Sequence, residues 1–289
     1  MQRKDFILLS SLGFLGLYSC GISHFKSKTK TLGIQLYTVR DAISAGLEKT
    51  LERLAGLGFT RLEIYGYNGT FFGKTGNEFQ AILKNTGLKV ISSHHTTGIL
   101  HKDRGTLLNS WEQSVEDLHS VGAEYMVCSY LFPEERTVEN YRKLPDLLNR
   151  SGEITRKAGI QFAYHNHDFE FEKFDGSDTV YDFILKHSSA ELVKMELDLY
   201  WMAKAGIDPL VYFEQHPKRF PLWHVKDMKA GSKDFAEIGK GTIDFTRIFG
   251  AREKAGLEYW FLEQDSSDKE MFESIEISQK YLLEHAYFR

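Results

Sequence analysis

One local pattern recurs along the chain and constrains its fold more than any other feature. Helix-like segments close on a glycine, and each is followed by a short apolar run that ends in polar residues. A glycine just past a helix end accommodates the left-handed cap, and an uninterrupted apolar run is typical of a parallel strand buried on both faces. The repeat therefore predicts alternating helices and parallel strands. It occurs as Gly58 before RLEIYG, Gly87 before KVISSHH, Gly122 before EYMVCSY, Gly159 before QFAYHNH and Gly256 before EYWFLEQD.

Eight candidate strands result when three further apolar runs, at residues 31–37, 192–198 and 221–225, are added. Alternation through eight units predicts an α/β fold, a (β/α)8 TIM barrel in a single domain, and the 289 residues fit its usual size of roughly 250. An open doubly wound sheet is the alternative, but no GxGxxG loop follows the first strand. Helical periodicity fills the intervals, at residues 42–57, 78–86, 106–121, 140–158, 180–187, 209–213, 243–255 and 267–286.

We expect residues 1–30 to be a leader and tether, separate from the barrel domain of residues 31–289. A basic start precedes an apolar run over residues 6–18, which is too short to span a bilayer but typical of a signal peptide. The run ends in LYSCG, which resembles a bacterial lipoprotein box with Cys20 as the lipidated residue; an uncleaved anchor is the alternative. The sequence thus predicts export, either to the periplasm or to a membrane-anchored position.

The charge balance and the cysteine count exclude several classes of protein. Lys and Arg total 36 against 40 Asp and Glu, a net charge of -4, and no dense basic run marks a nucleic-acid binder. The chain has 2 cysteines, Cys20 and Cys128, which form neither a disulfide framework nor a CxxC metal site. A small-molecule partner is expected, and the oligomeric state stays open.

Polar residues gather where the predicted strands end. In a barrel of this kind the functional site lies at that end, so these side chains converge on one mouth. Asp198, His224 and Glu263 end three successive strands, and an imidazole with two carboxylates suits Mn²⁺, Zn²⁺, Co²⁺ or Mg²⁺. The fifth strand, QFAYHNH, brings His165 and His167 to the same mouth and would supply a fourth ligand.

Five motifs, in this order, resemble the xylose-isomerase-like TIM-barrel family: YHNHDFEF, MELDLYW, FPLWHVKDM, IGKGTIDF and FLEQD. The resemblance covers the chain from Thr31 to its end and is strongest to the branch of sugar phosphate isomerases and epimerases. It implies a divalent metal held by a glutamate on strand five, an aspartate on strand six, a histidine on strand seven and a glutamate on strand eight. The last three correspond to Asp198, His224 and Glu263.

The fifth strand departs from this family pattern. Registering Asn166-His167 with the Glu-Asn-His strand end of the ketose epimerases puts His165 where the glutamate would be. We expect His165 to be the fourth ligand, with Glu170 as the alternative if the loop turns back. In the epimerases both metal-bound glutamates form a proton-transfer pair, so the replacement weakens the case for a symmetrical two-glutamate mechanism.

The expected chemistry uses a divalent metal, with Mn²⁺ as the first choice, to polarise a substrate carbonyl and stabilise an enediolate. Glu263 or His167 would remove a proton. A further histidine, His95 or His165, would return it or protonate a leaving oxygen. Lys226 would neutralise oxyanion charge.

Several of these residues also have a purely structural interpretation. Lys226 and Asp227 could form a surface ion pair. His94 is expected to point away from the site, opposite to its neighbour His95. Glu196 could be a buried network carboxylate below Asp198.

Three functions follow from the sequence. The first is a metal-dependent sugar isomerase or epimerase. The second is a metal-dependent lyase that eliminates the aglycone from 3-keto-glycosides, which export and the His165 departure favour. The third is a non-catalytic sugar-binding lipoprotein. An endonuclease IV-like activity is disfavoured, because the chain lacks a basic surface and the ligands of a trinuclear zinc site.

Overall fold

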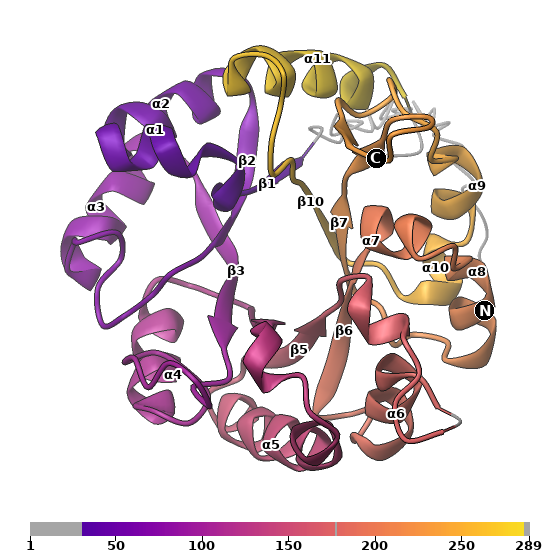
Figure 1. Ribbon diagram of the computed structural model, residues 1–289. Coiled ribbons are helices and arrows are strands. Elements are labelled where there is room, and N and C mark those ends of the chain that lie inside the picture. Colours follow the sequence, from indigo (N-terminus) through magenta and orange to yellow (C-terminus); the bar gives the residue numbers. More distant parts are fainter. Residues whose placement is uncertain (1–30, 177, 286–289) are drawn as a thin grey trace, which may run out of the picture.

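Eight parallel strands close into a barrel, and helices surround it (Figure 1). The computed structural model describes residues 31–176 and 178–285. The strand order is β1-β10-β7-β6-β5-β4-β3-β2, and β1 closes the barrel by pairing with both β10 and β2. Closure excludes the open doubly wound sheet and confirms the predicted (β/α)8 barrel. The strands are β1 (Leu32–Gln35), β2 (Phe59–Ile64), β3 (Lys89–Thr96), β4 (Tyr125–Tyr130), β5 (Gln161–His165), β6 (Val193–Asp198), β7 (Leu222–Val225) and β10 (Tyr259–Leu262).

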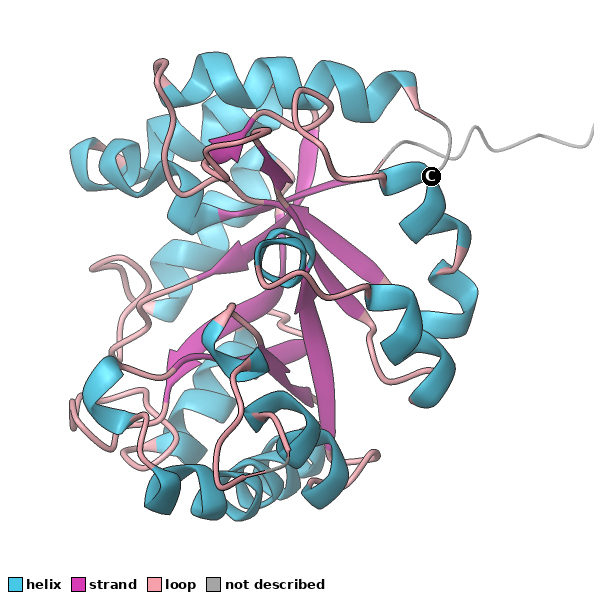
Figure 2. Ribbon diagram, turned by 45° about the vertical axis from the view of Figure 1, so that its right-hand side comes forward, coloured by secondary structure: helices cyan, strands magenta, loops and turns pink. Residues whose placement is uncertain are grey.

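Helices cover the outside of the barrel, as the turned view also shows (Figure 2). None of the helices in the described ranges is long and apolar enough to cross a membrane. The α-helices are α1 (Arg40–Ala45), α2 (Leu47–Gly56), α3 (Gly76–Thr86), α4 (Trp111–Ser120), α5 (Val138–Lys157), α6 (Val180–His187), α7 (Leu199–Lys204), α8 (Pro209–Gln215), α9 (Phe245–Gly250), α10 (Arg252–Ala255) and α11 (Met271–Glu284). Short 3-10 helices η1 (Leu36–Val39), η2 (Pro133–Glu135) and η3 (Phe169–Phe171) and a small hairpin of β8 (Asp227–Met228) and β9 (Phe235–Ala236) complete the described elements.

The glycine caps behave as the repeat predicts. Gly87 ends α3 at φ 72° and Gly256 ends α10 at φ 82°, both in the left-handed region that glycine tolerates best. Each cap turns the chain directly into the next barrel strand.

Two differences between the predicted and the observed helices bear on the site. The one expected over residues 106–121 begins only at Trp111, because the preceding segment bonds to β3 and its loop instead, through Leu107 N–H to Thr96 O at 3.0 Å. Helix α7 was not predicted; it starts at once after β6, with the Asp198 side chain accepting from Trp201 N–H at 2.9 Å. Both differences lie at the barrel mouth.

The strand alternation sets what faces the barrel axis. Apolar side chains that include Val127, Ala163, Leu222 and Phe261 form a small buried cluster of their own. Side chains two residues further along a strand point the same way. The predicted site residues on β5, β7 and just past β10 therefore stand directly above this apolar floor.

Candidate active site

The four predicted ligands meet at the mouth of the barrel. His165, Asp198, His224 and Glu263 each offer an atom within 4.8 Å of the others, and all four are buried. His224 Nδ1 lies 3.1 Å from His165 Nε2, 3.7 Å from Asp198 Oδ2 and 2.6 Å from Glu263 Oε2. We call these four residues the mouth quartet.

A lysine ammonium already sits against the mouth quartet. Lys226 Nζ lies 3.1 Å from Asp198 Oδ2, 2.8 Å from Glu263 Oε2 and 3.0 Å from Asp265 Oδ2, and the residue is only 3% exposed. Burial alone would lower the pKa of Lys226, but the three carboxylates hold it well above its usual value. The reading of Lys226 and Asp227 as a surface ion pair is therefore wrong. Asp227 turns away and caps the glycine turn, accepting from Gly239 N–H and Gly241 N–H at 2.9 Å each.

The mouth quartet fits a divalent metal by its chemistry. Burial lowers the pKa of His165 to about 4, so its imidazole is neutral and keeps a lone pair, as a metal ligand must. Burial would raise the pKa of Asp198, but Lys226 holds it well below the usual range, so this carboxylate stays ionised. Asp198 Oδ2 and Glu263 Oε2 are buried and accept no hydrogen bond of normal geometry from the described residues. These carboxylate oxygens, which are ion-paired with Lys226, and the imidazole nitrogens beside them form the N/O donor set of Mn²⁺ or Zn²⁺.

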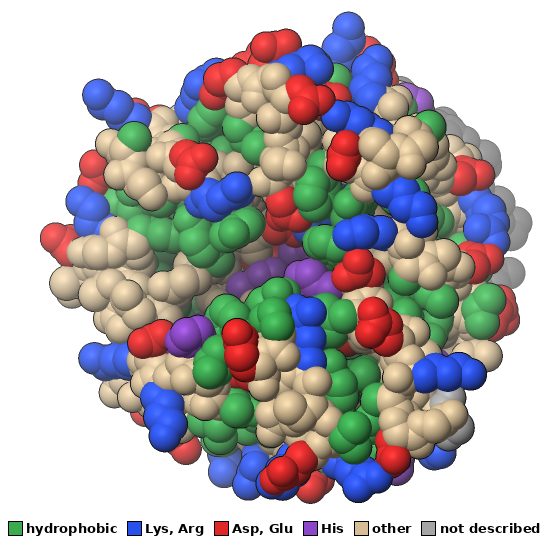
Figure 3. All heavy atoms as spheres, in the orientation of Figure 1, with side chains coloured by type: hydrophobic (Ala, Val, Ile, Leu, Met, Phe, Trp, Pro, Cys, Tyr) green, Lys and Arg blue, Asp and Glu red, His purple; other side chains and the backbone are tan. Residues whose placement is uncertain are grey.

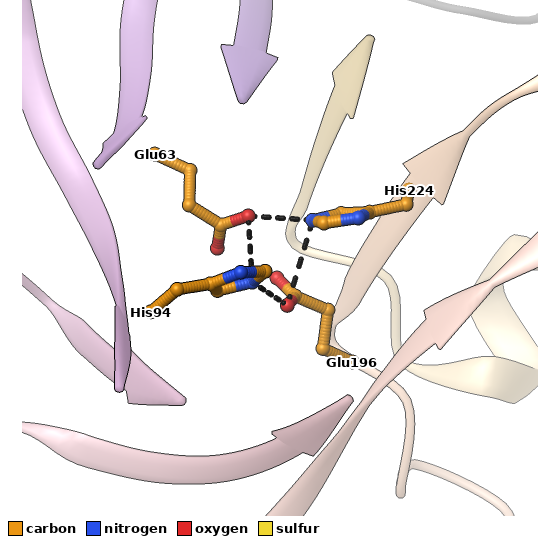
Figure 4. A group of neighbouring side chains, drawn as sticks. All are labelled: Glu63, His94, Glu196 and His224. Atoms are coloured by element: carbon orange, nitrogen blue, oxygen red, sulfur yellow. Dashed lines mark hydrogen bonds and ion pairs between the residues drawn. The ribbon is translucent and has the colours of Figure 1, made fainter. Parts of the chain in front are cut away.

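A second group of side chains lies below the quartet and shares His224 with it (Figure 4). The Glu63 Oε1 atom lies 2.5 Å from His224 Nε2 and 3.1 Å from His94 Nε2, and Glu196 Oε2 lies 2.7 Å from His94 Nε2. We call Glu63, His94, Glu196 and His224 the deep tetrad. Glu63 accepts the Nε2 proton of His224, the arrangement that orients a metal-binding histidine. Burial would lower the pKa of His224, but Glu196, Glu263 and Glu63 hold it well above its usual value, so Nδ1 must release a proton to bind a metal. Glu196 is thus a buried network carboxylate, as one sequence reading had it.

Both glutamates of the deep tetrad are fully buried, and His94 lies between them. Burial would lower the pKa of His94, but Glu63 and Glu196 raise it to about 9. Burial and the Glu63 charge together raise the pKa of Glu196 to about 8. Glu63 had no role in the site predicted from the sequence. Its position at the end of an apolar run was the available signal.

The expectation that His95 rather than His94 faces the axis is wrong. His94 joins the deep tetrad, whereas the His95 ring packs edge-on against Trp111 of α4 at 5.0 Å and its Nδ1 bonds to Gly105 O at 2.7 Å. The cause is a register shift in β3, where Leu62 pairs with Val90 but Glu63 pairs with Ser92. An extra residue in a strand inverts the alternation beyond it, so the inward face passes to His94.

Of the two candidates for the fifth-strand ligand, the structure brings His165 and not Glu170 to the mouth. Glu170 turns away from the mouth: Oε1 accepts from Tyr164 O–H and Oε2 from His167 N–H, each at 2.8 Å. Burial raises the pKa of Glu170 to about 8. His165 therefore takes the place in the mouth quartet, with its Nε2 3.4 Å from Asp198 Oδ2.

A cavity of about 1240 Å³ opens above the mouth quartet. Histidine side chains lie at the floor of the hollow and hydrophobic side chains flank it (Figure 3). All four residues predicted as catalytic border it, namely Glu263, His167, His95 and Lys226. His95 does so with its ring held in the packing outside the strands, which leaves the other three as the better placed groups.

His167 has the features of a proton-transfer residue. Its ring lies among aromatic neighbours, 4.9 Å from Tyr130 and 5.1 Å from Trp201, and its Nδ1 has no hydrogen-bond partner among the described residues. Burial holds the pKa of His167 well below its usual value, so the ring is neutral and can accept a proton. Trp201 and Tyr130 pack here and also line the cavity, so rim packing and contact with a ligand are compatible.

Comparison with known proteins agrees with this architecture. Inosose dehydratase of Bacillus cereus is 23% identical, and the match covers 91% of this chain and 99% of the relative. The crystal structure named a sugar phosphate isomerase/epimerase, from Parabacteroides distasonis, has a TM-score of 0.79 and 28% identity over 92% of this chain and 97% of that one. The IOLI protein, solved with a zinc atom, shares the fold with a TM-score of 0.69 at 15% identity, covering 88% and 97%. The model of the xylose isomerase-like TIM barrel family matches residues 51–281. With its closed barrel and its cavity at the strand ends, the chain belongs to the xylose isomerase-like TIM barrel family.

Proposed function

We propose that the protein is a metal-dependent lyase that eliminates an oxygen substituent β to the carbonyl of a keto sugar. The observation that carries the proposal is the place of His165 in the mouth quartet, with Glu170 turned away. A reaction that exchanges a proton between two facing glutamates needs a carboxylate on each side of the substrate. Here Glu263 is the one glutamate of the quartet, which favours a reaction run by a single proton carrier.

The chain's own residues can carry such an elimination. A divalent cation in the mouth quartet would supply Lewis acidity to the substrate carbonyl. Neutral His167 takes the proton from the carbon next to the carbonyl, and the C–H electron pair forms the new C=C bond as the C–O bond breaks. His167 then returns the same proton to the departing oxygen, so no further acid is required. Lys226 lies beside the quartet, where its ammonium balances negative charge on the substrate oxygen.

The relatives named inosose dehydratase support this reaction class, because loss of water from a keto polyol is the same elimination with water as the leaving group. The second candidate is the isomerase or epimerase, favoured by the solved relative that bears this name. It would use the same proton abstraction but return the proton to carbon.

The two candidates give different products in deuterated water. The experiment incubates metal-loaded protein in this solvent with ketoses, inososes and 3-keto-glycosides. We expect an unsaturated keto product together with released water or alcohol. Deuterium in a rearranged sugar, without a leaving group, would overturn the lyase in favour of the isomerase. If none of Mn²⁺, Zn²⁺, Co²⁺ or Mg²⁺ supports turnover, both enzyme candidates are refuted and a non-catalytic sugar-binding protein is favoured.

Matched variants assign the roles. His167→Gln should abolish turnover and retain the metal, whereas His119→Gln, at an exposed position of α4, should retain both turnover and metal. Asp198→Ala should lower the metal content measured by mass spectrometry, and an unchanged content would refute the quartet as ligand set.

We further propose that the chain is exported and that Cys20 carries its membrane anchor. The proposal rests on the apolar run before Cys20 in the sequence, and the leader lies outside the described residues.

A further inference from the structure

We propose that the far side of the cavity holds a binding subsite for a second ring, so that the substrate is an uncharged glycoside rather than a sugar phosphate. The subsite consists of Tyr37 and Tyr65, with Phe72 packed behind Tyr65. We call these three residues the aromatic corner. The inference rests on the proposed elimination and names its leaving group as the alcohol of a ring-bearing aglycone.

The cavity is larger than a single sugar ring would fill. Its volume of about 1240 Å³ exceeds the roughly 300–1,000 Å³ typical of sites for drug-sized ligands, and a monosaccharide is smaller than those ligands. A single ring at the mouth quartet would leave much of the cavity filled with water. A second ring removes more apolar surface from water and gains the corresponding free energy.

The aromatic corner lies across the barrel from the proton carrier. Tyr37 follows β1 and Tyr65 follows β2, whereas His167 follows β5. In the strand order, β5 is four strands from β1 in either direction, so the two stand opposite each other. A sugar ring held between His167 and the mouth quartet therefore has the corner on the opposite side of the cavity, where a substituent of the ring can reach it.

The corner is fixed in place and partly exposed. Tyr37 is 42% exposed, and the Arg40 guanidinium lies 4.5 Å from its ring centroid. Arg40 is itself anchored by Asp265 O at 2.9 Å. The Tyr65 ring meets Tyr37 edge-on at 5.3 Å and Phe72 at 5.4 Å. Rings held by such contacts bind a flat partner without first losing side-chain freedom.

The charges of the lining argue against a phosphate. Four Lys or Arg and four Asp or Glu side chains border the cavity, so these eight groups contribute no net positive charge. Lys226 is paired with three carboxylates, and Lys204 Nζ lies 3.1 Å from Asp168. Arg136 donates to Leu131 O and to the hydroxyl oxygen of Tyr130, and its guanidinium lies 3.6 Å from the Phe169 ring centroid. Among the described residues that line the cavity, this leaves Arg104 as the Lys or Arg side chain that could bind an anion, and a phosphate usually takes several donors.

The test compares ligands that differ only in the second ring. The full-length chain is titrated calorimetrically with methyl and nitrophenyl glycosides of gluco, galacto and manno configuration, and with a hexose phosphate. We expect a nitrophenyl glycoside to bind about tenfold more tightly than its methyl counterpart. Tyr65→Ala should remove this difference, and Tyr65→Phe should keep it. Tyr37→Ala, at an exposed position, should reduce it without disturbing the fold.

Equal affinity for the methyl and nitrophenyl glycosides would overturn the subsite, as would tighter binding of the hexose phosphate or binding of no glycoside. These outcomes are measured by binding and do not require turnover. A Tyr65-dependent preference without turnover of the corresponding 3-keto-glycosides would keep the subsite and refute the lyase. Turnover of a free keto sugar without that preference would keep the lyase and refute the subsite.

Discussion

Lys226 shows how one residue can tie stability to metal binding. Its ammonium is the charge partner of three buried carboxylates, two of which belong to the mouth quartet. Removing one partner of a buried ion pair is costly because it leaves an uncompensated charge in a poorly solvated place. A divalent cation bound at the same oxygens would restore that compensation.

We therefore expect Lys226→Met to lower the free energy of unfolding by about 3–5 kcal/mol in the presence of a chelator. Added Mn²⁺ should recover more stability in the variant than in the wild type, because the vacated carboxylates bind the cation more tightly. Urea unfolding with chelator and with Mn²⁺ measures the loss of unfolding free energy and its recovery. Lys229→Met is the control, since Lys229 forms an exposed pair with Asp268. Equal losses in the two variants would refute the role given to Lys226.

At the scale of elements, a carboxylate holds the turn that follows β7 and so positions Lys226 beside it. Asp227 accepts four backbone N–H groups, from Met228, Gly239, Gly241 and Ile243, at 2.8 to 3.2 Å. The glycine turn packs so closely on this carboxylate that a Cβ at Gly241 would overlap Asp227 Oδ1 and Met228 O. The IGKGTID motif therefore forms a tight turn around the Asp227 carboxylate.

Gly241→Ala should cost about 1–3 kcal/mol of unfolding free energy, because the Asp227 carboxylate must shift from its N–H donors. The matched control is Gly250→Ala, at the end of α9, where an added Cβ meets nothing within 4 Å. This substitution should be neutral or stabilising by up to about 1 kcal/mol. Urea denaturation distinguishes them, and a Gly241→Ala protein as stable as Gly250→Ala would contradict the packing described.

Glu170 joins η3 to the end of β5, and its protonation should make the stability of this junction depend on pH. Burial raises its pKa from 4.5 to about 8, so the folded state binds a proton that the unfolded state has lost between these values. Its contribution to stability is then complete below about pH 4.5 and is lost as the pH rises through about 8.

Replacing Glu170 by glutamine, its neutral isostere, should remove this pH dependence of stability. Glu170→Gln keeps an acceptor for His167 N–H and a polar contact for Tyr164 O–H. We expect the wild type to lose stability relative to Glu170→Gln as the pH rises from about 5 to 8, by at most about 1.4 kcal/mol per pH unit. The free energy of unfolding of both proteins is measured by urea denaturation across that pH range. If it changes with pH equally in the two proteins, Glu170 stays ionised and the prediction is wrong.

For the whole molecule, the export proposal is testable with the chain's own two cysteines. If Cys20 is the lipidated residue, the full-length protein should fractionate with membranes and Cys20→Ala should move to a soluble fraction. Cys128→Ala provides the control, because Cys128 is buried in β4. A wild-type protein found in the cytoplasm, or a Cys20→Ala protein that stays with the membranes, would refute the anchor.

The sequence by itself determined the order of the strands and the set of residues at their ends. Glycine caps and apolar runs are local signals, and in a barrel the strand ends meet in one place whatever the details between them. This is why His165, Asp198, His224 and Glu263 could be chosen as a group before the structure brought them together.

Only the tertiary structure decided which neighbour of a pair faces the axis and where each charge finds its partner. The shift between Leu62 and Glu63 in the β2–β3 pairing exchanged His94 for His95, and no local pattern reports it. The deep tetrad and the burial of Lys226 likewise depend on side chains far apart in the sequence. Such contacts form only when the barrel closes, because closure alone brings β2, β3, β6 and β7 around a single axis.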